Sequence, residues 1–150
     1  MTRRTWVSGV LAGWIGGFVG NAALGVAFST TWLKSLLFDP GWQSAAFIDL
    51  ALQRNVAISV AGLVLLSGVY GVLYAVIAPA IPGRTRLRKG LFWGFAIWAA
   101  YWVPQEWFVY VTLLREPIVL ALVELAVLLG GSLLQGVVIA ALLEPRKRRV

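Results

Sequence analysis

Two acidic residues, Glu106 and Glu124, lie inside long apolar stretches of the sequence. An ionisable side chain at membrane depth is costly unless it is paired, hydrated or neutralised, so both acids are candidates for a functional role. The segment Arg115-Glu116-Pro117 separates the two stretches, and at about 1.5 Å per helical residue each acid would lie roughly 12 to 15 Å from it. If the two side chains face each other, charge repulsion and desolvation would lead the pair to share a proton. The spacing does not fix the helix rotation and leaves open whether they meet.

Three further polar residues, Asn21, Arg54 and Gln105, are expected to form an intramembrane polar cluster with Glu106 and Glu124. Arg54 could neutralise an acid, because its apolar stem allows the charged end to reach inward. One interpretation is a hydrogen-bonded cluster that fixes the register of the helices. The alternative is a site for an ion, a proton or a substrate.

Pro104 and a row of aromatic residues distinguish the third apolar stretch. A proline inside a helix removes one backbone hydrogen bond, so a kink is expected there. Phe95, Trp98 and Trp102 are spaced to lie on one helical face near the middle of the stretch. This face could bind a flat lipid, a quinone or a carotenoid, or contact another subunit, but lipid contact or ordinary packing is the favoured explanation because an aromatic row is not diagnostic. The residues themselves predict no specific cofactor.

The first apolar stretch carries a broad face without side chains. Gly9, Gly13 and Gly17 repeat every four residues. Gly16 and Gly20 form a second row beside them. Small residues at this spacing allow another membrane helix to approach closely. The face could be used inside the chain, or it could bind a partner or a second copy.

Four stretches of the sequence are long and apolar enough to cross a bilayer, which takes roughly 20 residues. They run over about residues 6–28, 56–78, 90–114 and 118–143. Because the connection between the third and fourth is so short, we expect these two helices to form a tight antiparallel hairpin. Residues 29–54 form the only long loop, on the extracytoplasmic side. The sequence predicts an all-α integral membrane protein, with residues 1–150 in a single domain.

The distribution of Lys and Arg predicts the orientation of these spans, because cytoplasmic loops carry an excess of both residues. One side is expected to carry Arg3, Arg4, Arg84, Arg86, Arg88, Lys89, Arg146, Lys147, Arg148 and Arg149. The other side has only Lys34, Arg54 and Arg115. Both termini are therefore predicted to be cytoplasmic, in the inner membrane of a bacterium. Within the outer loop, residues 42–53 could form an interfacial helix or extend the second span.

Composition excludes several classes of chemistry. The chain of 150 residues is 60% hydrophobic and contains neither Cys nor His. The usual zinc and haem ligands and the commonest general base near neutral pH are therefore absent, and no metal site is predicted. The basic segments are expected to contact anionic lipid headgroups rather than nucleic acid.

These observations favour a non-enzymatic accessory subunit that contacts membrane lipids, pigments or the helices of a partner, or associates with itself. The alternative is a small oligomeric carrier or channel, in which Glu106 and Glu124 couple to a proton or another cation. A lipid-modifying enzyme would have to rely on carboxyl and tyrosine side chains alone.

Overall fold

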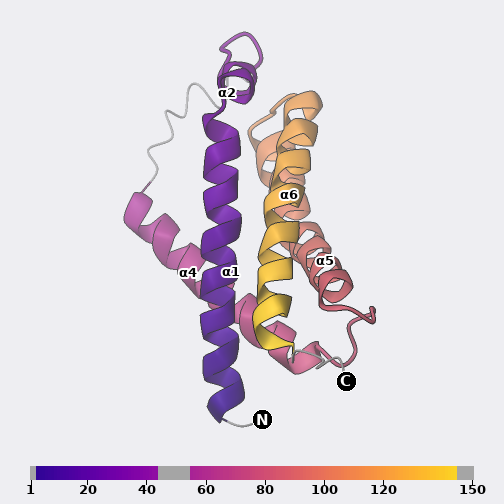
Figure 1. The fold of residues 1–150 in the computed structure, drawn as a ribbon. Coiled ribbons are helices and arrows are strands. Elements are labelled where there is room, and N and C mark those ends of the chain that lie inside the picture. The colour runs from indigo at the N-terminus through magenta and orange to yellow at the C-terminus, as the bar shows by residue number, and fades with distance from the viewer. Residues whose placement is uncertain (1–2, 44–54, 145–150) are drawn as a thin grey trace.

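The structure is a computed structural model that describes residues 3–43 and 55–144. All secondary structure in these residues is helical (Figure 1). The elements are α1 (Arg3–Ser29), α2 (Thr31–Leu37), α4 (Val56–Ile77), α5 (Arg86–Ile97), the π-helical segments η1 (Trp98–Trp102) and η2 (Gln105–Leu113), and α6 (Ile118–Leu143). The expected all-helical architecture is confirmed for the described part of the chain.

Three of the helices, α1, α4 and α6, are long and apolar enough to cross a membrane. Many of their large apolar side chains face outward, including Phe18 with an exposed fraction of 78%, Val26 with 69% and Leu65 with 68%. A protein surrounded by water rarely leaves apolar surface of this extent uncovered. Helix length and outward apolar side chains together fit a membrane protein.

The residues of the predicted third span, 90–114, do not form a single α-helix. α5 has 12 residues, and at about 1.5 Å per residue it is too short for roughly 30 Å of hydrocarbon. The chain stays helical from α5 to Leu113, but η1 and η2 follow the wider π-helical turn. Pro104 lies between these two segments. Because proline offers no N–H to the preceding turn, a change in helical winding beside it is physically reasonable.

α1 packs through its glycines against two helices of the same chain. A Cβ atom added at Gly13 would overlap the backbone of Ser67 in α4, and one added at Gly9 would overlap Val72. On the second row, a Cβ at Gly20 would meet the backbone oxygen of Gly131 in α6. Gly16 and Gly17 are enclosed in the same way, by α6 and α4 respectively. The glycine face is therefore used inside the chain.

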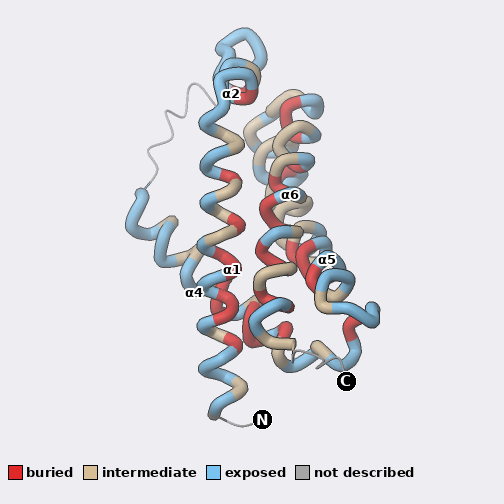
Figure 2. The backbone as a smooth tube through the Cα atoms, in the orientation of Figure 1, coloured by how far each residue is buried: buried red, intermediate tan, exposed pale blue. Residues whose placement is uncertain are grey.

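A further close approach joins α5 to α6. A Cβ atom at Gly90 would overlap Val137, and one at Gly94 would overlap Ser132 and Leu133. As the residue number rises along α5, the number of its neighbour in α6 falls. Figure 2 shows the buried positions of these helices facing one another, with the exposed positions on the outside.

Local signals explain where several helices begin. The side chain of Asn55 accepts a hydrogen bond from the N–H of Ile58 (3.1 Å) at the start of α4. The Thr85 side chain accepts one from the N–H of Arg88 (3.2 Å) at the start of α5. Both are N-cap interactions that satisfy an otherwise free donor of the first turn.

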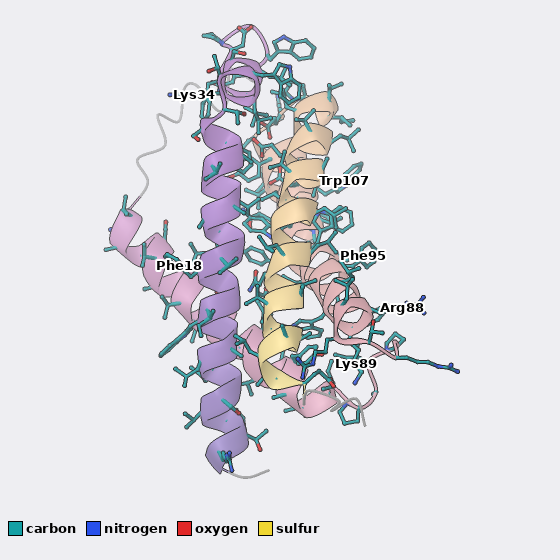
Figure 3. All side chains as sticks on the ribbon, viewed as in Figure 1. Phe18, Lys34, Arg88, Lys89, Phe95 and Trp107 are labelled. Carbon is teal, nitrogen blue, oxygen red and sulfur yellow. The ribbon has the colours of Figure 1, made fainter. Side chains whose placement is uncertain are left out.

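Basic side chains of the described residues are unevenly distributed along the molecule. α1 begins and α6 ends at the same end, where the connection between α4 and α5 also lies (Figure 1). Arg88 and Lys89 lie at this end, whereas Lys34 lies at the opposite end, on α2 (Figure 3). Residues 44–54 lie outside the described residues, and with them most of the stretch 42–53.

Candidate functional site

Three carboxyl groups meet beside the connection between η2 and α6. They belong to Glu106 in η2, Glu116 in the connection and Glu124 in α6. One oxygen from each lies within 4.8 Å of the others. The carboxyl groups of Glu106 and Glu124 are close enough to interact electrostatically with each other. The structure thus brings the two predicted acids together and adds Glu116 to them.

The three acids differ in exposure, and none of them has a positive partner among the residues that the structure describes. Glu106 has an exposed fraction of only 2%, whereas Glu116 and Glu124 are half-buried. Burial raises the pKa of the Glu116 carboxyl group above its ordinary value. The one ion pair found among the described residues joins Lys89 to Glu144, away from this cluster. A charge buried without compensation is expensive, so these carboxyl groups need protons or a cation to neutralise them.

The end of η2 places Glu116 over the other two acids. Arg115 has a φ of +54°, in the left-handed region that often ends a helix. The N–H of Glu116 then donates to the backbone oxygen of Tyr110 (2.9 Å), which folds the connection back onto η2. Pro117 follows directly before α6, where proline is tolerated because no donor is needed.

Two neutral polar side chains border the carboxyl cluster. The Tyr110 hydroxyl group lies close enough to all three acids to interact with them electrostatically, and it is hydrogen-bonded to the side chain of Gln105. One turn of helix separates Tyr110 from Glu106 along η2. The predicted residue Gln105 is therefore part of the surroundings of the cluster, through Tyr110.

Asn21, another member of the predicted polar cluster, does not lie at the acids. Asn21 in α1 donates from Nδ2 to the backbone oxygen of Gly17 (2.8 Å) and lines a groove between α1 and α4. Arg54 lies outside the described residues. The amide of Asn21 therefore satisfies a carbonyl of its own helix.

The predicted aromatic row is divided by the change in helical winding. The rings of Phe95 and Trp98 contact each other, with centroids 5.5 Å apart. The ring of Trp102 instead contacts Tyr101, with centroids 4.7 Å apart. Because a π-helical turn contains more residues than an α-helical one, the spacing that aligns side chains on an α-helix no longer applies here. Trp98 also donates from Nε1 to the backbone oxygen of Leu125 (2.9 Å), which fixes it against α6 beside Glu124.

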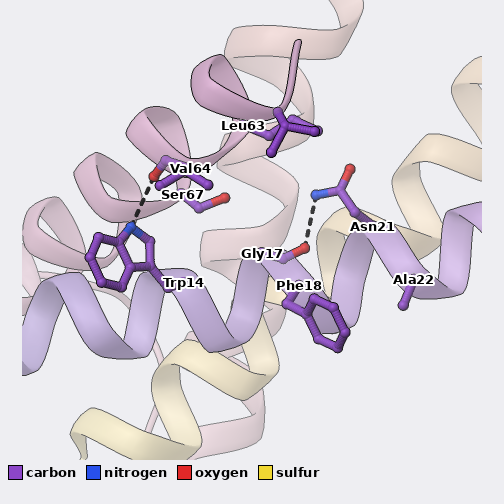
Figure 4. A pocket seen from close by; sticks show the side chains of 9 residues that line it. Trp14, Gly17, Phe18, Asn21, Ala22, Leu63, Val64 and Ser67 are labelled. Carbon is purple, nitrogen blue, oxygen red and sulfur yellow. Dashed lines mark hydrogen bonds between the residues drawn. The ribbon is translucent and has the colours of Figure 1, made fainter. Parts of the chain in front are cut away.

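A second feature is an apolar groove where α1 and α4 diverge. It has a volume of about 580 Å³ and is lined by Trp14, Gly17, Phe18, Asn21, Ala22, Val60, Leu63, Val64 and Ser67. Within its lining, the Trp14 indole donates from Nε1 to the backbone oxygen of Val64 (3.0 Å), as Figure 4 shows. Asn21 and Ser67 provide its few polar atoms.

Sequence reasoning missed Glu116 and Tyr110 as members of the acidic site. Glu116 entered the sequence analysis only as part of the segment that connects the third and fourth apolar stretches, and Tyr110 was not singled out. Tyr110 could have been predicted from its spacing, because it lies four residues after Glu106 and thus about one helical turn beyond that acid. The separation of ten residues between Glu106 and Glu116 gives no such indication. The position of Glu116 depends on the backbone at Arg115, which no residue pattern specifies.

Comparison of the chain with protein families, with curated proteins and with solved structures gives no match. What the site can do therefore follows from its own chemistry. Three carboxyl groups that converge without a positive partner among the described residues can take up protons or bind a cation through oxygen.

Proposed function

We propose that this chain is a small carrier or channel that binds a cation, either a proton or a metal ion, at the cluster of Glu106, Glu116 and Glu124. The observation that carries the proposal is the convergence of the three carboxyl groups within 4.8 Å. Acids inside membrane-spanning segments are rare, and when present they mark ion pathways or proton relays. The proposed role is not enzymatic.

The packing of α1 supports this proposal over that of a simple accessory subunit. A subunit role was favoured mainly by the glycine face formed by Gly9, Gly13, Gly16, Gly17 and Gly20. All five glycines contact α4 or α6 of the same chain. That face is consequently not free to receive a partner helix.

The proposal includes four spans, with residues 86–113 as the third. The run from Gly90 to Glu106 contacts α6 from Val137 back to Glu124, which supports an antiparallel hairpin with the acids near its closed end. Arg88 and Lys89 lie at the other end of the molecule (Figure 3), and Arg84 lies in the connection between α4 and α5 at that end. This concentration of basic residues supports a cytoplasmic location for both termini, in a bacterial inner membrane. Glu116 and Glu124 are half-buried, so the site would be reached from the outer side.

The function can be tested with the purified protein in lipid vesicles that contain a pH-sensitive dye. Gradients of H⁺, Na⁺, K⁺, Mg²⁺ or Ca²⁺ are imposed in separate experiments. An ionophore carries compensating charge across the membrane, so that movement of the cation is not stopped by a membrane potential. We expect one of these cations to move through the wild-type protein, and Glu106→Gln to abolish that flux because the buried ligand loses its charge. Asp39→Asn serves as the matched control, since Asp39 is an exposed acid on the α2 side of the molecule. Absence of flux in the wild type, or equal flux in both variants, would refute the function.

The accessory-subunit role is retained as a second candidate because of the groove between α1 and α4. An apolar groove at membrane depth could receive a lipid tail, a quinone, a carotenoid or a partner helix. Purification in mild detergent followed by mass spectrometry would decide this role. A stoichiometric partner or pigment would support it, and a chain recovered with bulk lipid alone would exclude it.

A further inference from the structure

The acidic cluster contains a buried polar atom that the protein itself leaves unsatisfied. Oε2 of Glu106 has no hydrogen-bond partner among the described residues, although the side chain is only 2% exposed. Oε2 of Glu116 is also buried without a partner in this part of the chain. Native proteins pair nearly all such atoms, and an ion or a water molecule is the usual explanation for one that is unpaired.

Resting on the proposed cation site, we propose that Glu106, Glu116 and Glu124 bind one divalent metal ion of the size and hardness of Ca²⁺. All three ligands are carboxyl oxygens, which hard cations prefer. The chain has no Cys or His, so zinc and copper would lack the ligands that select them. Glu116 acts here as the third ligand, contributed by the connection between the two helices.

The oxygens of the cluster lie close enough together to bind a single ion. One oxygen from each carboxyl group lies within 4.8 Å of the others, and Ca²⁺ binds oxygen at roughly 2.3 to 2.6 Å in flexible geometry. Mg²⁺ requires near-octahedral geometry at about 2.0 to 2.1 Å and loses its water ligands reluctantly, so a group of three carboxyl ligands favours Ca²⁺.

The exposure of the three acids also suits an ion that keeps some of its water ligands. Glu106 lies at the buried side of the cluster, whereas Glu116 and Glu124 are half-buried. Water could complete the six to eight ligands that Ca²⁺ takes. The neutral Tyr110 hydroxyl group lies beside the same oxygens and is held by Gln105.

The test is calorimetric titration of the metal-free, detergent-solubilised protein with CaCl₂ alone, and with MgCl₂ in a parallel experiment. We expect one Ca²⁺ ion per chain, bound more tightly than Mg²⁺. Glu116→Gln should weaken Ca²⁺ binding by roughly tenfold or more, since affinity depends on the number of charged ligands. Glu116→Asp keeps the charge and should retain weaker but measurable binding, and Asp39→Asn should bind as the wild type does. Helix content by circular dichroism verifies that each variant is folded.

Two results would refute the proposed divalent site. One is no Ca²⁺ binding by the wild type, and the other is wild-type affinity in a folded Glu116→Gln variant. Failure of this inference differs from failure of the proposed function. If Ca²⁺ does not bind but another cation still crosses vesicles in a manner that requires Glu106, the carrier proposal stands and the divalent site is wrong. If Ca²⁺ binds without any flux, the site is supported and the carrier proposal is wrong.

Discussion

At the scale of single residues, the described part of the chain has charged side chains in two different environments. At one end, Lys89 donates from Nζ to Oε1 of Glu144 (2.9 Å) and to the backbone oxygen of Ala78 (2.9 Å). The Tyr74 hydroxyl group donates to the same carboxyl oxygen (3.2 Å). Each polar atom here has a partner, so this group joins α4, α5 and α6 structurally. The three clustered acids have no such positive partner among the described residues, and two of their oxygens are buried without a hydrogen-bond partner there.

A first prediction concerns this pair of charges. Lys89→Met should lower the free energy of unfolding by about 1 to 3 kcal/mol, because it leaves the Glu144 carboxylate and the Ala78 carbonyl without their donor. The neighbouring side chain of Arg88 is exposed, so Arg88→Met should change stability by no more than about 0.5 kcal/mol. Unfolding in detergent can be followed by fluorescence of the eight tryptophans. Equal stability of the two variants would show that Lys89 does not join the helices.

Residue patterns predicted part of the site and could not predict the rest. Glu106 and Glu124 stood out because charges are rare in apolar stretches, and their equal distance from the connection placed them at one depth. Their rotation toward each other depends on the π-helical winding of η2, which sequence periodicity does not specify. Glu116 joins them because the backbone at Arg115 reverses direction. Asn21 was expected with them on depth alone, and packing of α1 against α4 directs it elsewhere.

At the scale of helices, glycine determines how close the elements lie. The three close contacts, α1 with α4, α1 with α6 and α5 with α6, each place glycine against the backbone of the neighbouring helix. In lipid this close packing is a main source of helix association, since apolar side chains gain little by leaving the membrane. The sequence predicted the face on α1, but its use by two neighbours depends on the three-dimensional arrangement. The packing role of Gly90 and Gly94 was not predicted, although these glycines are also spaced by four residues.

A second prediction separates packing glycines from exposed ones on the same helix. Gly13→Leu should destabilise the protein by at least about 1 to 3 kcal/mol, because the new side chain would overlap the backbone of Ser67. Gly25 also lies in α1, but an added Cβ would meet nothing within 4 Å. Gly25→Leu should therefore be neutral or slightly stabilising, since glycine weakens a helix interior. Thermal unfolding of both variants in the same detergent provides the measurement, and equal losses would contradict this account of α1.

At the scale of the whole molecule, the apolar outer surface fits a lipid surrounding better than an aqueous one. Helices that expose Phe18, Val26 and Leu65 to this degree would aggregate in water. The basic side chains of the described residues lie mainly at one end, beside the connection between α4 and α5 (Figure 3). Apolar sides and a single basic end are consistent with the proposed bilayer location, in which the basic end lies on the cytoplasmic face.

The natural absence of cysteine allows this arrangement to be tested with single-cysteine variants. In intact cells a membrane-impermeant maleimide should label Ser35→Cys, because α2 lies at the end expected outside. It should label Arg84→Cys only after the cells are permeabilised, since that residue lies at the basic end. Phe18→Cys should stay unlabelled in both conditions, although Phe18 has an exposed fraction of 78%, because lipid would surround it. Labelling of Phe18→Cys in intact cells would mean that water reaches the middle of α1, and labelling of Arg84→Cys from outside would reverse the orientation. The first of these results would remove the reason for regarding the burial of the three acids as a cost that only protons or a bound cation can offset.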